Sequence, residues 1–346
     1  MKNGTINRKK EHLKIAQNHS VHFEEITSGF EHYHFVHNAL PEINIEDVDF
    51  HTTFLGYDLK LPLIICSMSG GEQEGEMLNR DLAIAANKSG IALALGSIRP
   101  ALENRDALGS FLVARENAPD IPIIANIGAT QLVKDFKTKD LLKLLKEIQV
   151  DAISIHLNPL QEALQPEGEP HFKGVSRAIE ILRETLPYPV IVKEVGFGLS
   201  FDVIKRLQKM GIQWIDIAGA GGISWSRVEH MRTDNNARRS IASQFFEWGI
   251  PTVDAILHAV RVKQMHIIAS GGIDDGLKFA KAIALGAELA GAATLFLRAR
   301  NSDGVEGVTD LIKVFSETLR IAMFCCGCRN LEEFRGNQSI ITSRKK

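Results

Sequence analysis

Eight short apolar runs, separated by longer amphipathic segments, constrain the fold of this chain more than any other feature. The runs are rich in Ile, Val, Leu and Ala and do not alternate strictly between apolar and polar residues, which is typical of parallel strands buried on both faces. Segments of helical length lie between them: Glu76–Ser89, Asp140–Gln149, Ser200–Met210 and Gly276–Leu285. Eight strand-helix units in one chain predict an α/β fold of the (β/α)8 TIM barrel type. The predicted strands are Leu63–Met68, Ile91–Leu95, Ile121–Asn126, Ala152–His156, Val190–Glu194, Trp214–Ala218, His266–Ser270 and Leu289–Ala293.

The barrel is expected to occupy residues 61–346, preceded by an N-terminal arm and pre-barrel segment over residues 1–60. A doubly wound sheet is the alternative fold, but no Gly-x-Gly-x-x-Gly motif follows the first predicted strand. Seven of the twelve histidines fall within residues 1–60. Because their spacing is irregular, we expect a surface arm there rather than a metal site.

Composition excludes several classes of protein. The net charge of −2 over 346 residues gives no reason to expect nucleic acid or an anionic membrane as a partner. No apolar stretch is long enough to span a bilayer, and the polar N-terminus does not resemble a secretory signal. Four cysteines do not form a disulfide framework, so we expect a cytoplasmic protein. Cys325, Cys326 and Cys328 leave a tetrahedral zinc site one ligand short, and packing at a helix end is the better interpretation.

A polar cluster follows the fourth predicted strand. The strand runs directly into His156, Asn158, Gln161 and Glu162, and Pro159 prevents the ladder from continuing. Burying such a cluster is unfavourable unless something binds to it. Histidine can move protons near neutral pH, and a glutamate can hold a hard cation through oxygen. The alternative is a polar loop that merely closes the strand.

Glycines gather at the carboxyl ends of the last three predicted strands, where barrel enzymes place their sites. Glycine lets backbone N–H groups approach a phosphate closely, and barrel phosphate sites commonly follow strands seven and eight. Tight turns also use glycine, but the repetition of the pattern favours a bound phosphate. The glycine-rich ends are Gly219–Gly222, Gly271–Gly272 and Gly291.

Single polar residues at other strand ends are weaker candidates. Lys193 closes an apolar strand, so it needs either an acidic partner or an anion that develops on a cofactor ring. Arg99 presents a guanidinium fork that suits a diphosphate. Asn126 is ambiguous, because an amide at a turn is common. The hydroxyls of Ser69, Ser97 and Ser224 either bond the polar edge of a flavin or cap turns.

Taken together, these motifs resemble the type 2, flavin-dependent isopentenyl-diphosphate isomerases. The resemblance runs from the N-terminal Arg-Lys-Lys-Glu-His to the last predicted strand. The histidine-to-glutamate loop of the fourth strand, joined with the N-terminal Arg-Lys pair, is the most specific part. The segments that carry it are Arg8–His12, His37–Glu42, Ser67–Gly71, Ile153–Glu162, Val192–Gly196, Gly221–Ser226 and Phe246–Thr252.

The resemblance implies a barrel that binds FMN and Mg²⁺ and interconverts isopentenyl and dimethylallyl diphosphate in isoprenoid biosynthesis. It further implies NADPH as the reductant of the flavin and a homo-oligomer, a tetramer or octamer. Gln161, His156 and Lys193 would be catalytic, and Glu162 would hold the metal. The substrate would contact Arg8, Lys9, Ser97, Arg99, His156, Asn158 and Gln161. FMN would contact Ser67, Met68, Ser69, Ser97, Asn126, Lys193, Ser224, Gly271, Gly272, Ile273, Asp274, Ala293 and Thr294.

The chain departs from the family pattern at several positions. Serine stands in place of threonine at Ser69 and Ser224, which keeps the hydroxyl. Ile98 replaces a polar residue. Asp274 stands where the family typically has arginine, and it exchanges a positive charge near the phosphate for a negative one. Asp274 should weaken FMN binding if it points inward, and should not if it points to solvent or caps the helix near Gly276.

Two alternative functions stay open at this point. Another FMN barrel, such as a 2-hydroxy acid oxidase, would need a histidine base at the carboxyl end of the seventh strand, but His266 stands at the start of that strand. A barrel that binds FMN or phosphate without catalysis is the second alternative.

Overall fold

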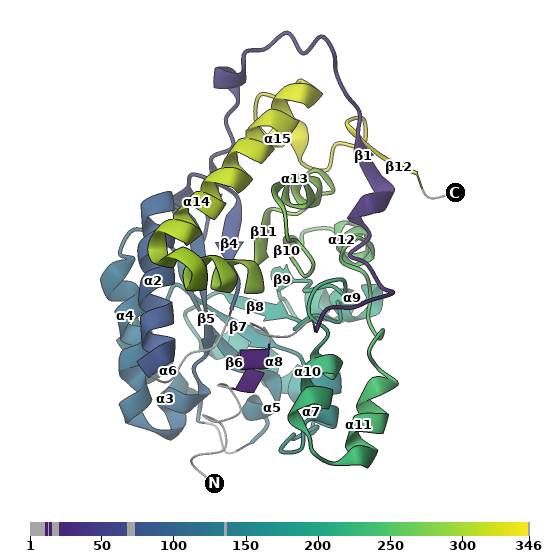
Figure 1. Cartoon of the computed structure of the whole chain (residues 1–346). Coiled ribbons are helices and arrows are strands. Elements are labelled where there is room, and N and C mark those ends of the chain that lie inside the picture. Colours follow the sequence, from purple (N-terminus) through teal and green to yellow (C-terminus); the bar gives the residue numbers. More distant parts are fainter. Residues whose placement is uncertain (1–10, 13, 16–20, 68–72, 135–136, 345–346) are drawn as a thin grey trace.

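The computed structural model describes residues 11–12, 14–15, 21–67, 73–134 and 137–344. Its centre is a closed barrel of eight parallel strands, in the order β10-β11-β4-β5-β6-β7-β8-β9 (Figure 1). The predicted (β/α)8 barrel is therefore confirmed, and each predicted strand overlaps an observed one. The strands are β4 (Leu63–Ile65), β5 (Ala92–Ser97), β6 (Ile123–Gly128), β7 (Ala152–His156), β8 (Val190–Lys193), β9 (Trp214–Asp216), β10 (His266–Ser270) and β11 (Leu289–Ala292).

Helices follow each barrel strand and cover its outer face. Two of these helices begin at residues that favour helix N-termini. Ser200 is the N-cap of α9 and Asp275 is the N-cap of α13, and the side chain of each accepts a hydrogen bond from a backbone N–H of the first turn. The outer helices are α2 (Gln73–Ser89), α4 (Gly109–Asn117), α6 (Thr138–Ile148), α8 (Val175–Thr185), α9 (Phe201–Lys209), α12 (Thr252–Val260), α13 (Gly276–Ala284) and α14 (Thr294–Cys326), which kinks at Asp303–Gly304.

Shorter helices lie mostly in the loops at the carboxyl ends of the strands. These loops hold the candidate site, so the short helices position its side chains. They are α3 (Arg99–Glu103), α5 (Ala129–Leu132), α7 (Pro159–Leu164), α10 (Trp225–Arg232) and α11 (Asn236–Ser243); α15 (Leu331–Phe334) follows α14. Single 3-10 turns are η1 (Phe30–His32), η2 (Ile45–Asp47) and η3 (Arg105–Leu108).

The hydrophobic core has two parts because successive residues of a strand point to opposite faces. Residues that face outward pack with the helices in one large cluster. Those that face inward fill the barrel interior: Ile64, Cys66, Ala92, Ile124, Ala152, Ile191, Ile268 and Leu289.

A hairpin of β2 (Thr52–Phe54) and β3 (Tyr57–Leu59) closes the amino-terminal end of the barrel. Phe54 and Leu59 are fully buried against the interior residues. The Phe54 ring meets Trp214 edge to face, with 4.8 Å between ring centroids. The Tyr57 hydroxyl donates to Asp151 Oδ1 at 2.8 Å. The opposite, carboxyl end is the one left for a site.

Residues 21–35 connect distant parts of the chain. Strand β1 (Tyr33–Phe35) pairs antiparallel with β12 (Ile341–Ser343), and the two lie side by side in Figure 1. His22 forms a β-bridge with Ile223, beside the carboxyl end of the barrel. The N-terminal segment thus reaches from the C-terminal strand to the candidate site.

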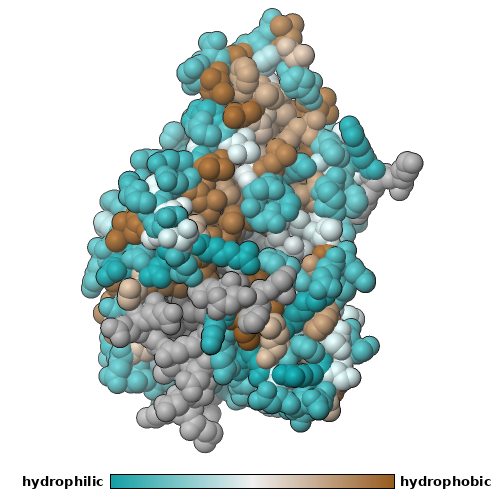
Figure 2. Space-filling model, viewed as in Figure 1, coloured by the Kyte–Doolittle hydropathy of each residue, from teal (hydrophilic) through white to brown (hydrophobic). Residues whose placement is uncertain are grey.

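The described helices and the visible surface can be compared with what a membrane-spanning element needs. Among the described residues, no helix combines the length and the apolar character needed to cross a bilayer. Figure 2 shows a face on which hydrophilic side chains predominate and apolar ones gather mainly in its upper half.

Candidate active site

A pocket of about 180 Å³ opens at the carboxyl ends of the strands. It lies between the loops after β4, β8, β9, β10 and β11, so the barrel brings together segments that are far apart in the sequence. Of the predicted site residues that the structure describes, it contains Ser67, Lys193, Gly271, Gly272, Ile273, Asp274, Ala293 and Thr294.

Glycines in and beside the pocket allow neighbouring backbone segments to approach each other closely. A β-carbon on Gly271 would lie 2.0 Å from the carbonyl oxygen of Gly219, and one on Gly221 would lie 2.2 Å from the backbone nitrogen of Ser28. Both glycines also have positive φ, at 98° and 117°. Close packing of the loops therefore explains these glycines without a phosphate, which weakens the argument that the sequence pattern alone provided.

Lys193 ends β8 with its side chain in the pocket. Its Nζ lies 3.4 Å from Asp216 Oδ2, and the Ser270 hydroxyl donates to Asp216 Oδ1 at 2.6 Å. The sequence left open whether Lys193 has an acidic partner or faces a cofactor, and the geometry allows both. The adjacent Glu194 points away to the backbone, where burial raises its pKa to about 7 although three N–H groups bond its carboxylate.

The polar residues after β7 form a linked cluster. Asn126 Oδ1, from the end of β6, lies 2.9 Å from His156 Nδ1. Asn158 Nδ2 donates to Gln161 Oε1 at 3.1 Å and to Glu162 Oε1 at 3.0 Å. The last three side chains are more than nine-tenths buried, so the cluster is built into the fold and is not a solvated loop.

The loop after α7 fixes the Glu162 carboxylate from its other side. The backbone N–H of Glu169 donates to Glu162 Oε2 at 2.8 Å. A β-carbon on Gly168 would lie 1.9 Å from the Glu162 carbonyl oxygen, so the loop can pack this closely only with glycine there. Glu162 is consequently oriented before any cation arrives.

Among the predicted site residues that the structure describes, two buried polar atoms have no hydrogen-bond partner. These are Ser67 Oγ, in the pocket, and Asn158 Oδ1, in the polar cluster. An unsatisfied buried acceptor or hydroxyl is unfavourable by about 1–3 kcal/mol, so each marks a place where a ligand or water would be stabilised.

Other predicted site residues already interact with protein groups. The Ser224 hydroxyl donates to the Phe246 carbonyl at 2.9 Å, and this residue is fully buried at the N-cap of α10. Arg99 Nε lies 2.5 Å from Glu103 Oε1, which would have to release it to a diphosphate. Ser97 pairs in register with Asn126. Met68, Ser69, Arg8 and Lys9 lie outside the described residues.

Asp274 is exposed and forms an ion pair with Lys278 Nζ at 2.6 Å. It does not cap the following helix: Asp275 does, by accepting from the Lys278 N–H at 2.7 Å. The suggestion that Asp274 is that cap is therefore wrong. Arg298, one turn into α14, lines the same end of the pocket and lies 3.3 Å from His22 Nε2. These cations offset the charge of Asp274.

Comparison with known proteins places this site in a family. Residues 141–342 match the FMN-dependent dehydrogenase family. The isopentenyl-diphosphate delta-isomerase of Pyrococcus abyssi is 41% identical, over 99% of this chain and 94% of that protein. The isomerase of Rickettsia prowazekii is 45% identical, over 95% of each.

The chain belongs to the isopentenyl-diphosphate delta-isomerase family.

Solved structures show a wider kinship of fold. A flavocytochrome b2 variant superposes with a TM-score of 0.69 at 16% identity, covering 96% of this chain and 82% of that one. A mandelate oxidase variant gives 0.65 at 15%, covering 100% and 99%. Yet His266 lies at the amino-terminal end of the barrel, stacked on Trp214 and paired with Glu288. It is not the strand-end base that an oxidase of this fold would need.

The described residues of this isomerase-family chain fit FMN and a magnesium ion. The partnerless Ser67 hydroxyl and Lys193 could bond the polar atoms of a flavin in the pocket. For the metal, no group of three or more His, Cys, Asp or Glu residues gathers anywhere in the described chain. Glu162 would then be a single protein ligand, which suits Mg²⁺, since this ion commonly takes its other ligands from water and phosphate.

Several residues at this site were missed by sequence reasoning. His22 and Arg298 reach the pocket from the arm and from α14, and neither lies in a strand-end motif. Arg298 gave one usable signal, because a cation near the start of a helix opposes the helix dipole unless an anion is close.

Proposed function

We propose that this protein interconverts isopentenyl diphosphate and dimethylallyl diphosphate, with reduced FMN and Mg²⁺. The observation that carries the proposal is the buried Asn158–Gln161–Glu162 cluster beside a pocket that fits a flavin, in a chain 41% identical to a named isomerase over nearly its full length. Family membership supports the reaction, and the cluster supports the position of the substrate.

The polar cluster would bind the diphosphate end of the substrate. Mg²⁺ on Glu162 would neutralise phosphate charge, and Asn158, whose Oδ1 lacks a partner in the described structure, could orient a water of the metal shell. His156, Arg99 and Ser97 would donate to phosphate oxygens, as would Arg8 and Lys9 from the arm. Arg99 would first exchange its Glu103 partner for the substrate.

The pocket would hold the flavin and the alkene. Reduced FMN supplies proton-transfer chemistry that side-chain acids perform poorly on an unactivated alkene. Lys193 would stabilise negative charge on the reduced ring and is itself held by Asp216. Gln161 would orient the alkene, while Gly271, Gly272 and Thr294 would present N–H groups to the FMN phosphate.

Three further expectations stay predictions: NADPH as the reductant, a cytoplasmic location and a homo-oligomeric state. The last is supported by exposed apolar side chains beside a groove of about 280 Å³ on α13 and α14. Leu277 and Ile321 are 46% and 52% exposed there.

The test is an anaerobic assay with isopentenyl diphosphate, FMN, reductant and Mg²⁺. We expect turnover that chelator or oxidised flavin abolishes. Glu162→Gln should raise the Mg²⁺ concentration required and the apparent KM, while FMN content stays unchanged. Glu306→Gln, which alters an exposed carboxylate on α14, is the matched control. Turnover unaffected by chelator, or loss of flavin in Glu162→Gln, would refute the assignment.

A further inference from the structure

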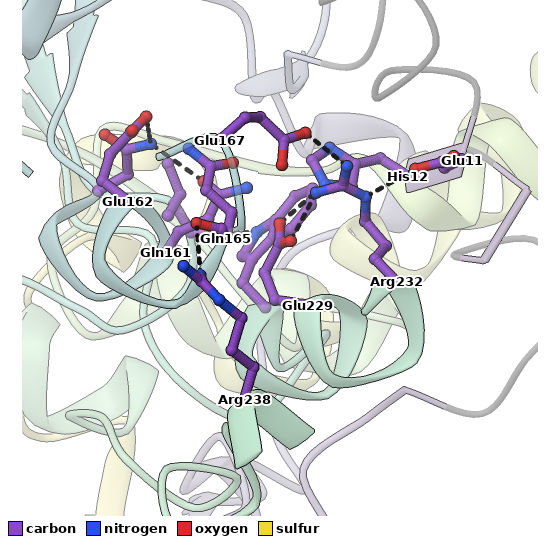
Figure 3. A network of polar contacts seen from close by, with 12 residues as sticks. Glu11, His12, Gln161, Glu162, Gln165, Glu167, Glu229, Arg232 and Arg238 are labelled. Carbon is purple, nitrogen blue, oxygen red and sulfur yellow. Dashed lines mark hydrogen bonds and ion pairs between the residues drawn. The ribbon is translucent and has the colours of Figure 1, made fainter. Parts of the chain in front are cut away.

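Arg232, the last residue of α10, lies at the centre of a network of carboxylates (Figure 3). Its guanidinium contacts Glu229 at 2.6 Å, Glu167 at 2.6 Å and Glu11 at 3.0 Å. The Arg232 and Glu229 side chains are 5% and 0% exposed. Such a desolvated pair requires close partners, and these come from three separate parts of the chain.

On one side the network holds the N-terminal arm. Glu11 binds Arg232, and His12 Nε2 lies 2.8 Å from Glu229 Oε1. The His12 ring also meets Trp225 edge to face at 5.1 Å. Lys9 and Arg8 precede Glu11 by two and three residues, so connectivity keeps their α-carbons within about 11 Å of that of Glu11. Anchoring residues 11 and 12 therefore restricts where those two cations can reach.

On the other side the network holds the loop that orients Glu162. Glu167 binds Arg232 and stands next to Gly168, which packs on the Glu162 carbonyl. The backbone N–H of Glu169, which follows Gly168, donates to Glu162 Oε2. In Figure 3, Glu167 lies between Arg232 and the Gln161–Glu162 pair. A movement of Glu167 would thus be transmitted to Glu162 over very few bonds.

We infer that Arg232 is a positioning residue that couples docking of the N-terminal arm to the loop holding Glu162. The Arg232 guanidinium contacts Glu11 of the arm and Glu167 of the loop at the same time. Each of these carboxylates helps to hold the guanidinium in the position that the other one binds, so the arm and the loop stabilise each other. The ligand-dependent part of this inference rests on the proposed function, in which Glu162 holds Mg²⁺ and the arm cations bind a diphosphate.

Limited digestion with trypsin measures arm release directly, because Lys9, Lys10 and Lys14 are cleavage sites. We compare FMN-loaded wild type, Glu11→Ala and Glu167→Ala, with Glu306→Ala as the control for loss of an exposed carboxylate. Loss of one partly exposed ion pair should speed cleavage about two- to fivefold in Glu11→Ala. Mg²⁺ with inorganic pyrophosphate should protect the wild type, and Glu167→Ala should lose part of that protection.

Kinetics provide a readout that general destabilisation would not reproduce. Glu11→Ala should raise KM for the diphosphate substrate more than it lowers kcat. Glu167→Ala should raise the Mg²⁺ concentration for half-maximal rate, and the two changes combined should be less than additive, because both remove partners of one guanidinium. Arg232→Lys should retain more of the protection than Arg232→Gln.

Equal cleavage rates in Glu11→Ala and Glu306→Ala would overturn the anchor, and strictly additive effects would overturn the coupling. Failure of the proposed function is a separate outcome. A wild type that turns over no isopentenyl diphosphate would refute that function, while cleavage without ligand would still decide whether Arg232 anchors the arm.

Discussion

At the scale of single residues, charges of both signs meet at the α14 end of the pocket. Asp274 is 61% exposed and satisfied by Lys278, so its charge is largely screened by solvent. Arg298 lines the pocket and lies near His22, whose pKa is lowered by burial and by that guanidinium. A phosphate dianion at this end would therefore meet more positive than negative charge.

Arg298→Met should weaken FMN binding about three- to fivefold, the value of one partly exposed charge contact. Asp274→Asn should change the affinity by less than about twofold, because Lys278 and solvent already screen the aspartate. Titration of apo-protein with FMN, followed by flavin fluorescence, measures both. Arg177→Met removes an exposed cation on α8 and controls for net charge. An unaltered affinity in Arg298→Met would show that this arginine does not contact the phosphate.

Sequence reasoning identified the polar residues that directly follow strands, because a barrel places all strand ends on one face. Asn126, His156 and Lys193 were found in this way, and they do lie on that face. The sequence could not show whether a serine hydroxyl is available to a ligand. Ser224 donates to a carbonyl 22 residues away, whereas Ser67 lacks a partner in the described structure. Such partners depend on distant backbone, which local patterns do not encode.

At the scale of elements, Glu247 fastens the arm to the loop before α12. Its carboxylate accepts from the backbone N–H groups of Glu24, Glu25 and Ile26, and it contacts Arg227 at 2.9 Å. Burial alone would raise the pKa of Glu247, but these donors lower it to about 2, from an ordinary value of 4.5. The charged form is therefore the one that stabilises the folded state.

Glu247→Gln should lower the free energy of unfolding by about 2 kcal/mol at pH 7, since a shift of one pKa unit corresponds to about 1.4 kcal/mol and an amide still accepts some of the bonds. A lowered pKa stabilises above pH 4.5, and that contribution is lost as pH falls towards 2. The difference between wild type and variant should hence shrink between pH 5 and pH 3. Urea unfolding at several pH values checks this, and a gap independent of pH would contradict it.

The helices and strands of the barrel were predictable, and the short strands outside it were not. The helix expected over Gly276–Leu285 is observed as α13, because its apolar periodicity and its acidic N-cap agree. By contrast β1, β2, β3 and β12 each have three residues, too few to show a period of two. Strand β1 pairs with β12 from the far end of the chain, and the β2–β3 hairpin packs on the barrel interior, so both pairs depend on the tertiary fold.

At the scale of the whole molecule, the β2–β3 hairpin and the pocket lie at opposite ends of the barrel, so a mutation in the hairpin should change stability without changing ligand binding. Phe54→Ala should cost about 3–5 kcal/mol, the usual loss for a buried phenylalanine, because it leaves a cavity at the amino-terminal mouth. FMN affinity should not change, since the pocket is at the other end. Leu40→Ala, at a side chain 74% exposed, should alter stability by less than about 0.5 kcal/mol. Denaturant unfolding with parallel FMN titration would reveal any coupling between the two ends.

The β1–β12 pair has a consequence for biosynthesis. Ribosomes add about 5–20 residues per second, so Tyr33 leaves the peptidyl-transferase centre on the order of fifteen seconds to a minute before Ser343 is added. During translation β1 has no strand to pair with, even after every barrel segment has been made. The segment that runs from the candidate site to β1 can take its final place only after residues 341–343 have been synthesised. A nascent chain that stalls before β12 would hold a complete set of barrel strands while β1 is unpaired.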